Sequence, residues 1–540
     1  MPCPPPETSQ NCSPEEFTGA SDNSAAQQLD LLVRLRVLEH LQNTLGYPIP
    51  VQQDTQSLTE QVVLDVLDWI AQCYALNPSD AVTVAVSTRP GIVTLHLCHD
   101  DVKSAIQTSK VFLAMLRTVL NFDENTNSSS VIAPIFQMVV NMAYPRILHK
   151  VSRIGITDGG PDDTAHHFTS LVTAWMLFRP GGEQSRGFVK VATNYAGTTA
   201  RTTEYMVQSF ITIVEQCNAG ARCKDMNEQK RFSYLSSIVV ACNLLINSTF
   251  FNDLHNHESF RSSLRVEDRL FLHKIFRRLS YIASYKSGAA KFAFLGVPYL
   301  RQVLGQDGVK NFANGRDGSI RVELATYFDA SKVPAIPTKS FSWPSEPPVD
   351  HLPGLFNVSF DNSHSPSSSP RHSRDTSNAS GYSTSSNSTE ASAHARSILA
   401  HLDNELRYEI LHSEMVAEAW TPGGTASVRC HPELQLIQYL EHCGINVAYS
   451  AIGMSKLACW ACARYVDCLN LDAEYIEDDR VEGEIAPKLR WIMREGGGGK
   501  VKCDWMIPSM AKVEMMDMLM DDTQRELERV IHEVVLDYYI

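Results

Sequence analysis

The sequence predicts a multidomain protein: a mainly α-helical N-terminal region with one β-hairpin, followed by a C-terminal α/β domain. Three observations support this fold class. The 540 residues exceed the size of one ordinary domain. Apolar residues recur at helical spacing over much of the first 335 residues, and a Ser- and Pro-rich stretch separates them from a second helical pattern. We therefore divide the chain into a lead-in (1–24), a helical region (25–335), a linker (336–395) and a C-terminal domain (396–540).

The lead-in and the helical region differ sharply in composition. Residues 1–24 are rich in Pro, Ser, Asn and Thr, and we expect them to be disordered. From Ala26 to Leu45, leucines recur every three or four residues, which predicts an amphipathic helix. Further helices are predicted at about 56–76, 101–121, 129–144, 163–178, 202–217, 227–248 and 266–285. The sequence assigns this region neither a catalytic constellation nor a protein partner.

One segment of the helical region is predicted to be extended. Two runs rich in β-branched residues, Ala81–Ser87 and Ile92–Cys98, flank the turn sequence Thr88-Arg-Pro-Gly91. Such runs joined by a Gly-containing turn are typical of a β-hairpin.

The linker is predicted from its composition. Residues 336–395 are dominated by Ser, Pro, Asn, His and Thr, as in Ser365–Arg371. A stretch of this kind buries too little apolar surface to offset its chain entropy, so we expect it to be disordered. A helical pattern resumes at Ser397 and runs to about Trp420, where we place the start of the second domain.

The charge balance limits the ligands that the protein is expected to bind. The formal net charge is −14, from 61 acidic and 47 basic residues, and residues 421–540 alone carry about −8. This balance gives no overall positive field for gripping a nucleic-acid duplex through its phosphates. A free base, a nucleoside or a short unpaired nucleotide fits it better.

The termini and cysteines indicate the compartment. The start, Met-Pro-Cys-Pro-Pro-Pro, lacks the features of a signal peptide, and no run of eighteen apolar residues occurs. The 13 cysteines are spread too thinly for a secreted disulfide scaffold. We expect a cytoplasmic or nuclear protein without a membrane segment.

The segment that carries chemistry begins at His431. Pro432 is suited to the first turn of a helix, which places His431 and Glu433 at the entrance of that helix. A short strand is predicted from about Asn446 to Ile452, ended by Gly453, and a second helix begins near Ser455 or Ala458. Cys459 and Cys462 are three residues apart in this helix, so both thiols share one face.

These residue types together indicate a metal site. Two thiolates and one imidazole leave a fourth tetrahedral position for water, which is the arrangement of a catalytic zinc site. A carboxylate beside that water can take its proton and pass it on, and Glu433 has the right type and position for this role. We therefore predict that His431, Cys459 and Cys462 bind Zn²⁺ and that Glu433 carries the proton.

This order, His-x-Glu, a strand, then Cys-x-x-Cys on the next helix, resembles the zinc-dependent cytidine-deaminase-like superfamily. The strings His431-Pro-Glu-Leu-Gln-Leu436 and Ile452-Gly-Met-Ser-Lys-Leu-Ala-Cys-Trp-Ala-Cys462 are similar to its toxin-type, OTT-like branch, which is abundant in fungi. The resemblance covers about residues 396–540 and implies an α-β-α deaminase-like domain. It also implies that His431, Cys459 and Cys462 hold the zinc ion and that Glu433 is the catalytic acid and base.

The chain departs from the superfamily pattern in two places. Ala458 stands where a proline usually precedes the first cysteine, and the first two strands of the fold have no assigned position before Val428. Downstream, Gly499–Pro508 is predicted to be a strand and resembles the Trp-containing strand of the branch.

Two functions remain open from the sequence. The first is hydrolytic deamination of a nucleobase in a nucleoside, a nucleotide or single-stranded nucleic acid. The alternative is a non-catalytic, zinc-stabilised interaction module attached to a helical scaffold. A fourth cysteine ligand would favour this alternative, and the candidates close in sequence are Cys430, Cys443, Cys468 and Cys503.

Overall fold

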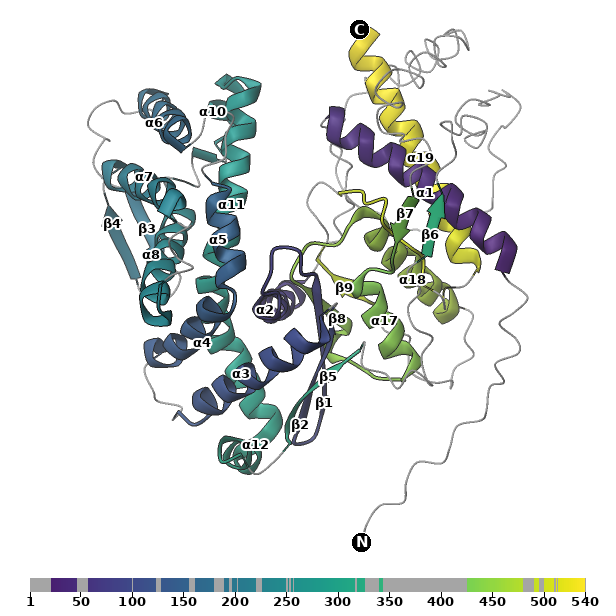
Figure 1. Cartoon of the computed structure of the whole chain (residues 1–540), viewed down its shortest axis with the longest axis horizontal. Coiled ribbons are helices and arrows are strands. Elements are labelled where there is room, and N and C mark those ends of the chain that lie inside the picture. Colours follow the sequence, from purple (N-terminus) through teal and green to yellow (C-terminus); the bar gives the residue numbers. More distant parts are fainter. Residues whose placement is uncertain are drawn as a thin grey trace, which may run out of the picture.

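The architecture is that of a computed structural model of the whole chain, in which a five-stranded sheet lies between a helical part and a C-terminal part (Figure 1). The structure describes residues 21–45, 57–99, 101–122, 128–154, 161–178, 189–193, 197–201, 203–219, 226–248, 251, 254–255, 257–315, 318–325, 339–342, 425–478, 490–494, 500–508, 511 and 513–539. Residues 1–20 of the predicted lead-in, most of the predicted linker and the helix expected from Ser397 to Trp420 lie outside these residues. Residues 21–24, which were expected to belong to the disordered lead-in, form the start of a helix instead.

The helices of the described residues are α1 (Ser21–Leu45), α2 (Leu58–Tyr74), α3 (Val102–Leu120), α4 (Ser128–Met142), α5 (Tyr144–Ser152), α6 (Pro161–Phe178), α7 (Thr203–Ala219), α8 (Glu228–Ile246), α10 (Glu258–Ser263), α11 (Val266–Lys291), the π-helical turn η4 (Phe292–Gly296), α12 (Val297–Ala313), α17 (Pro432–His442), the 3-10 turn η6 (Ala448–Ser450), α18 (Trp460–Asp478) and α19 (Val513–Tyr539). The strands are β1 (Val82–Arg89), β2 (Ile92–His99), β3 (Val189–Thr193), β4 (Gly197–Arg201), β5 (Ile320–Leu324), β6 (Lys339–Ser342), β7 (Thr425–Val428), β8 (Ala451–Met454) and β9 (Ile492–Met493).

The predicted helices of the N-terminal region and its hairpin are confirmed to within a few residues, except that α11 continues to Lys291 instead of ending near residue 285. Helix α2 begins with a capping box, in which Glu60 N–H donates to Ser57 Oγ (3.2 Å) and Ser57 N–H donates to the Glu60 carboxylate (2.7 Å). Among the described residues, no single helix is long and apolar enough to cross a membrane. Only α4 and α5 together reach that length and composition, and they are bent by 72° at their break.

The main sheet joins distant parts of the chain. Its strand order is β5-β2-β1-β8-β9, with β1 antiparallel to both β2 and β8, and with the outer pairs β2–β5 and β8–β9 parallel. Val82 and Ser455 fix the register, because Ser455 N–H donates to Val82 O and Val82 N–H donates to Ser455 Oγ, both at 2.9 Å. The hairpin therefore supplies β1, which pairs directly with β8, and β2 on the far side of β1, so it is not confined to the helical region.

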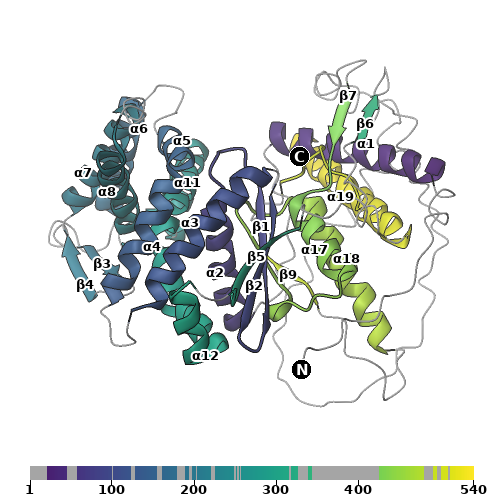
Figure 2. The same cartoon turned by 60° about the horizontal axis from the view of Figure 1, so that its bottom comes forward.

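Side chains on successive strand residues point to opposite faces, so the sheet separates two cores. Val82, Val84 and Val86 face the core formed with α2, α3 and α11, whereas Ala85 faces the core formed with α17 and α18. Figure 2 shows the helical bundle and the C-terminal helices on either side of the sheet. Gly453 lies where α2 crosses β8, and a Cβ there would stand 2.3 Å from the backbone carbon of Leu67.

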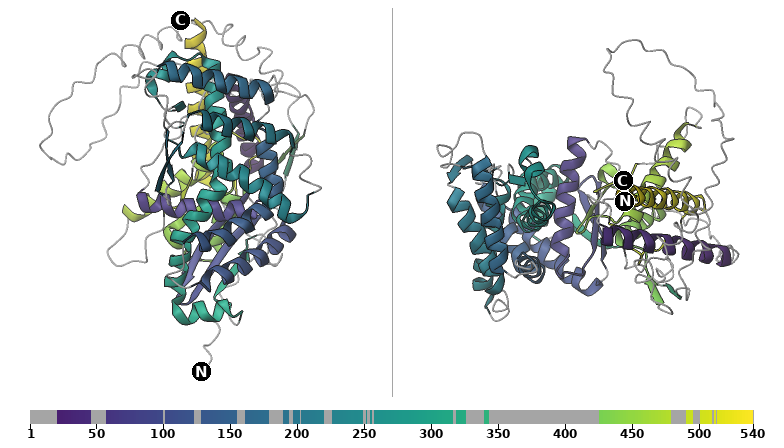
Figure 3. Two further views of the ribbon diagram at one scale, coloured as in Figure 1. Left: turned by 90° about the vertical axis from the view of Figure 1, so that its left-hand side faces the viewer. Right: turned by 90° about the horizontal axis from the view of Figure 1, so that it is seen from above.

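Helix α1 packs with the C-terminal part of the chain, although it precedes the helical region in sequence. It crosses α19, as two directions of view show (Figure 3). Its buried leucines, including Leu31, Leu35 and Leu38, belong to the same core as α17 and α18. Gln28 ties it to the C-terminal segment, since its side chain accepts from Ile507 N–H (3.0 Å) and donates to Trp505 O (3.4 Å).

Three predictions of local structure are corrected. The strand expected at Asn446–Ile452 begins only at Ala451, because Tyr449 and Ser450 have left-handed φ values of 59° and 49°, and it continues through Gly453. The strand expected at Gly499–Pro508 is absent from the described residues 500–508, where one isolated bridge joins Trp505 to Arg429. Within the predicted linker, Lys339–Ser342 forms β6, which is antiparallel to β7.

Candidate metal centre

Hydrogen bonds fix the chain on both sides of His431. Two residues before it, Arg429 donates its N–H to Asp504 O and accepts from Met506 N–H, both at 3.0 Å. As predicted, Pro432 occupies the first turn of α17, and His431 is the residue that precedes the helix. Thr83 of β1 donates its hydroxyl to Pro432 O (3.0 Å), so the hairpin fixes the end of the helix that carries the site.

The two cysteines lie where the chain leaves β8 and enters α18. Cys459 immediately precedes the helix and Cys462 lies in its first turn, so α18 starts slightly later than predicted. Trp460 N–H donates to Lys500 O (2.9 Å) and Ala463 N–H donates to Cys459 O (3.0 Å), which fixes both cysteines. The positive end of the α18 dipole favours the thiolate form of such residues.

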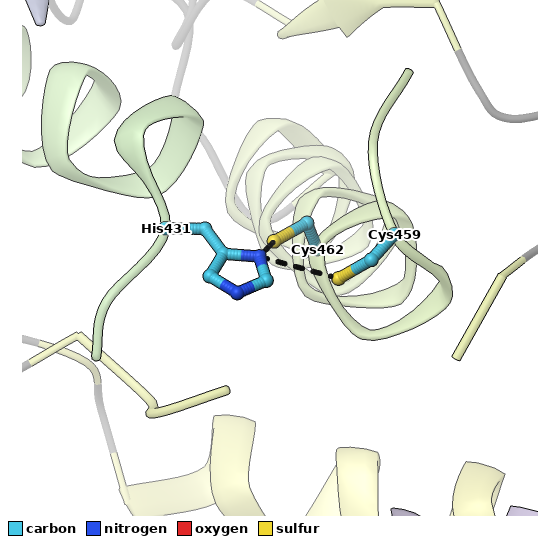
Figure 4. Close-up of side chains that lie close together, drawn as sticks. All are labelled: His431, Cys459 and Cys462. Atoms are coloured by element: carbon cyan, nitrogen blue, oxygen red, sulfur yellow. Dashed lines mark hydrogen bonds between the residues drawn. The ribbon is translucent and has the colours of Figure 1, made fainter. Parts of the chain in front are cut away.

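Three side chains converge at one point (Figure 4). His431 Nδ1 lies 3.5 Å from Cys459 Sγ and 3.4 Å from Cys462 Sγ, and all three possible ligand atoms lie within 4.8 Å of one another. Tetrahedral zinc with usual bond lengths would separate such ligand atoms by roughly 3.5–3.8 Å. The distances and the donor types therefore fit a tetrahedral metal ion.

Two further side chains contact these three groups. Asp504 Oδ1 lies 3.5 Å from His431 Nε2, the ring nitrogen that faces away from the thiols. Trp505 donates its indole N–H to Cys462 Sγ (3.2 Å) and is fully buried. A carboxylate on the second nitrogen of a ligating histidine is a common arrangement in metal sites, because it fixes the tautomer and the ring orientation.

The ionisable groups of the site shift one another's pKa values. Burial disfavours the imidazolium form of His431, but the Cys459 thiolate and the Asp504 carboxylate outweigh this and raise its pKa. Burial opposes ionisation of Cys459, yet the Cys462 thiol and the charged His431 lower its pKa, whereas burial and the neighbouring thiolate raise the pKa of Cys462. A divalent cation would replace the protons that these three groups share.

Glu433 lies beside the three convergent groups. It is buried, and its Oε1 lies 3.9 Å from His431 Nδ1, on the side where the sulfur atoms lie. In the described part of the chain, the group that could hold a metal consists of His431, Cys459 and Cys462. Cys430, Cys443, Cys468 and Cys503 all lie within the described residues and are not part of it.

Sequence reasoning missed Asp504 and Trp505. Both lie in the segment that was predicted as a strand, and only the tryptophan stood out there. A single carboxylate in an irregular segment has no spacing signal that would assign it to a distant histidine.

An apolar cavity of about 240 Å³ lies away from the site. Its lining includes Val63 and Leu67 of α2, Val86 of β1, Leu95 of β2 and Phe112 of α3, all of which belong to the core on the helical side of the sheet. None of the convergent residues lines it, so this cavity is separate from the candidate metal centre.

The comparison with known families agrees with this geometry. Residues 430–509 match the sequence model of the family described as OTT_1508-like deaminase. No curated protein and no solved structure matches the chain. The C-terminal part of the chain thus contains a segment of the deaminase-like superfamily, and the matched residues include the whole group that could hold a metal.

Proposed function

We propose that the protein is a zinc-dependent hydrolytic deaminase that acts on a nucleobase in a nucleoside, a nucleotide or single-stranded nucleic acid. One observation carries this proposal: a buried carboxylate, Glu433, lies beside a group of one imidazole and two thiols whose spacing suits tetrahedral zinc. Three protein ligands leave one position for water, which is characteristic of catalytic zinc sites.

The residues of the chain have distinct roles in this proposal. A bound zinc ion would supply the activation of the attacking water molecule. Glu433 takes a proton from that water and delivers it to the ring nitrogen and the leaving amine, so that ammonia is released and a carbonyl forms on the base. Asp504 holds His431 with Nδ1 toward the thiols, and buried Trp505 orients Cys462.

The alternative is a zinc-stabilised module without activity. Structural zinc sites usually have four protein ligands. The four additional cysteines that could have closed this site lie outside the convergent group in the described residues, which favours the enzyme.

Metal analysis and a screen for ammonia release test the proposal together. The full-length protein should contain one zinc ion per chain and should release ammonia from at least one nucleoside, nucleotide or single-stranded oligonucleotide. Stoichiometric zinc with no ammonia from any of these compounds would favour the non-catalytic module. Absence of zinc from the folded protein would contradict both functions.

A further inference from the structure

A cluster of basic side chains flanks the metal centre, although the protein as a whole is acidic. It comes from α5, α11, the loop after β8 and the segment after β9. We call it the basic cluster, and its members are Lys150, Arg153, Arg277, Lys456, Lys500 and Lys502. Lys150 is half-buried and the other five are exposed.

Hydrogen bonds fix these segments against one another. Arg146 of α5 is buried and donates to Ser455 O (2.9 Å), which ties α5 to the loop that carries Lys456. Arg278 of α11 donates to Arg153 O, and α5 and α11 lie side by side in both Figure 1 and Figure 2. These bonds fix α5, α11 and the loop after β8 against one another.

The same contacts place the cluster close to the metal-binding group. Lys456 precedes Cys459 by three residues, and three residues span at most about 10 Å. The backbone carbonyl of Lys500 accepts the N–H of Trp460, and Trp460 lies between the two cysteines in sequence. Lys456 and Lys500 thus both lie near the entrance to α18.

The cations are close enough to repel one another. Burial and then the charges of Arg146, Arg153, Lys456 and Arg277 lower the pKa of Lys150 to about 8. Burial, Arg277, Lys502 and Arg153 lower the pKa of Lys500, with Glu39 opposing. Arg153 and Arg277 act on both Lys150 and Lys500, and Lys456 acts on Lys150, so the cations from all four segments lie near one another.

Few carboxylates offset this charge. Among the described residues, Lys150, Arg153, Arg277 and Lys500 form no ion pair, whereas Lys502 lies 3.6 Å from Glu39. Concentrated charge of one sign attracts an oppositely charged ligand, and arginine and lysine are the usual ligands of phosphate. Cations from four separate segments suit several phosphates in a row better than a single phosphate.

We propose that the basic cluster binds the phosphates of a single-stranded nucleic acid and thereby presents one of its bases to the metal centre. This inference rests on the proposed deaminase function and narrows its substrate class. A single strand is favoured over a duplex because a deaminase must reach an unstacked base, and because the acidic remainder of the surface repels a bulky polyanion.

The test measures binding separately from catalysis. Full-length protein carrying Glu433→Gln, which should bind without turnover, is titrated into a fluorescein-labelled single-stranded oligonucleotide, and anisotropy is followed at several salt concentrations. The same titration is made with the additional changes Arg153→Gln, Arg277→Gln and Lys500→Gln. A matched control carries Lys103→Gln, Lys110→Gln and Lys230→Gln, three exposed lysines on α3 and α8.

The triple change in the basic cluster should weaken binding by at least about tenfold at low salt. It should also reduce the slope of log affinity against log salt by about 2, since each phosphate contact contributes about 0.7 for a single strand. The control lysines should change neither quantity. Zinc content and circular dichroism should be the same in all variants.

Three outcomes would overturn the inference: unchanged affinity after the triple change, an equal loss in the control variant, or tighter binding of the duplex of the same sequence. A nucleoside monophosphate that competes as well as the oligonucleotide, at equal phosphate concentration, would also overturn it in favour of a single phosphate site. If free nucleosides are deaminated while oligonucleotides do not bind, only the inference fails. If oligonucleotides bind and no compound is deaminated, only the proposed function fails.

Discussion

The two faces of the main sheet are built from the same strands but pack against different helices. On the helical face, Val84 and Leu95 enter a core of aliphatic and aromatic side chains. On the other face, strand side chains form polar contacts with α17: Thr83 donates to Pro432 O, and the Cys98 thiol donates to Gln435 Oε1 at 3.1 Å. Both faces thus stabilise the sheet by burial, and strand side chains on the second face also position α17, the helix that His431 precedes.

This comparison predicts that identical substitutions have different effects on the two faces. The largest difference is expected for cysteines. Changing Cys459 and Cys462 to Ser should abolish stoichiometric zinc, because serine hydroxyls replace both thiolate ligands. Changing Cys73, which is fully buried on the helical face, to Ser should leave zinc content unchanged. Metal analysis of the purified variants measures both effects, and full zinc in the double variant would refute the ligand assignment.

The next largest effect concerns activity alone. Glu433→Gln keeps the shape of the side chain but cannot accept and return a proton, so deamination should fall by at least about a hundredfold. Zinc content and melting temperature should stay nearly the same. The control is Glu441→Gln on the same helix, where an amide oxygen can still accept the N–H of Trp491, and activity should be retained. Ammonia release is the measurement, and full activity of Glu433→Gln would exclude this residue as the proton carrier.

A smaller effect is expected from the carboxylate behind the histidine. Asp504→Ala removes the acceptor next to His431 Nε2, and loss of such a partner typically weakens metal binding about 10- to 100-fold. Asp504→Asn retains an acceptor oxygen and should lose less. Competition with a chromophoric zinc chelator gives the affinities. Equal affinity in the wild type and in Asp504→Ala would show that Asp504 does not support the site.

The same contrast explains what the sequence could predict. Helices that pack through aliphatic residues can be predicted from the spacing of those residues. The helix expected at 101–121, for example, is confirmed as α3, Val102–Leu120. The convergence of His431, Cys459 and Cys462 was also predictable, since few residue types bind zinc and each of the two motifs is short in sequence, whereas zinc binding itself stays a prediction. In both cases the residues that carry the signal lie close together in sequence.

Pairing between strands that are far apart in the chain has no such signal in the sequence. Val82 and Ser455 are 373 residues apart, and nothing in the sequence of the hairpin indicates β8 as its partner, so the first two strands of the deaminase-like fold had no assigned position before Val428. The basic cluster could not be predicted for the same reason, because its members come from four separate segments. The net charge of −14 also gives no indication of a local excess of basic residues. Asp504 contacts His431 from an irregular segment whose buried Val501 and Trp505 imitate a strand.

The smallest predicted effect tests the link between the faces most directly, using two buried threonines. The Thr83 hydroxyl donates to Pro432 O, whereas the buried Thr108 hydroxyl on α3 has no hydrogen-bond partner among the described residues. Valine has nearly the shape of threonine, so either Thr→Val change removes a hydroxyl and keeps the packing. Thr83→Val leaves a buried carbonyl without its donor and should lower the free energy of unfolding by about 1–3 kcal/mol.

Thr108→Val should leave the stability unchanged or raise it, because an unpaired buried hydroxyl is replaced by a methyl group. Urea unfolding followed by circular dichroism compares the two variants with the wild type. Because Pro432 lies between His431 and Glu433, Thr83→Val should also weaken zinc retention, and Thr108→Val should not. Equal midpoints and equal zinc retention in the two variants would mean that the hairpin only completes the sheet and does not hold the metal centre in place.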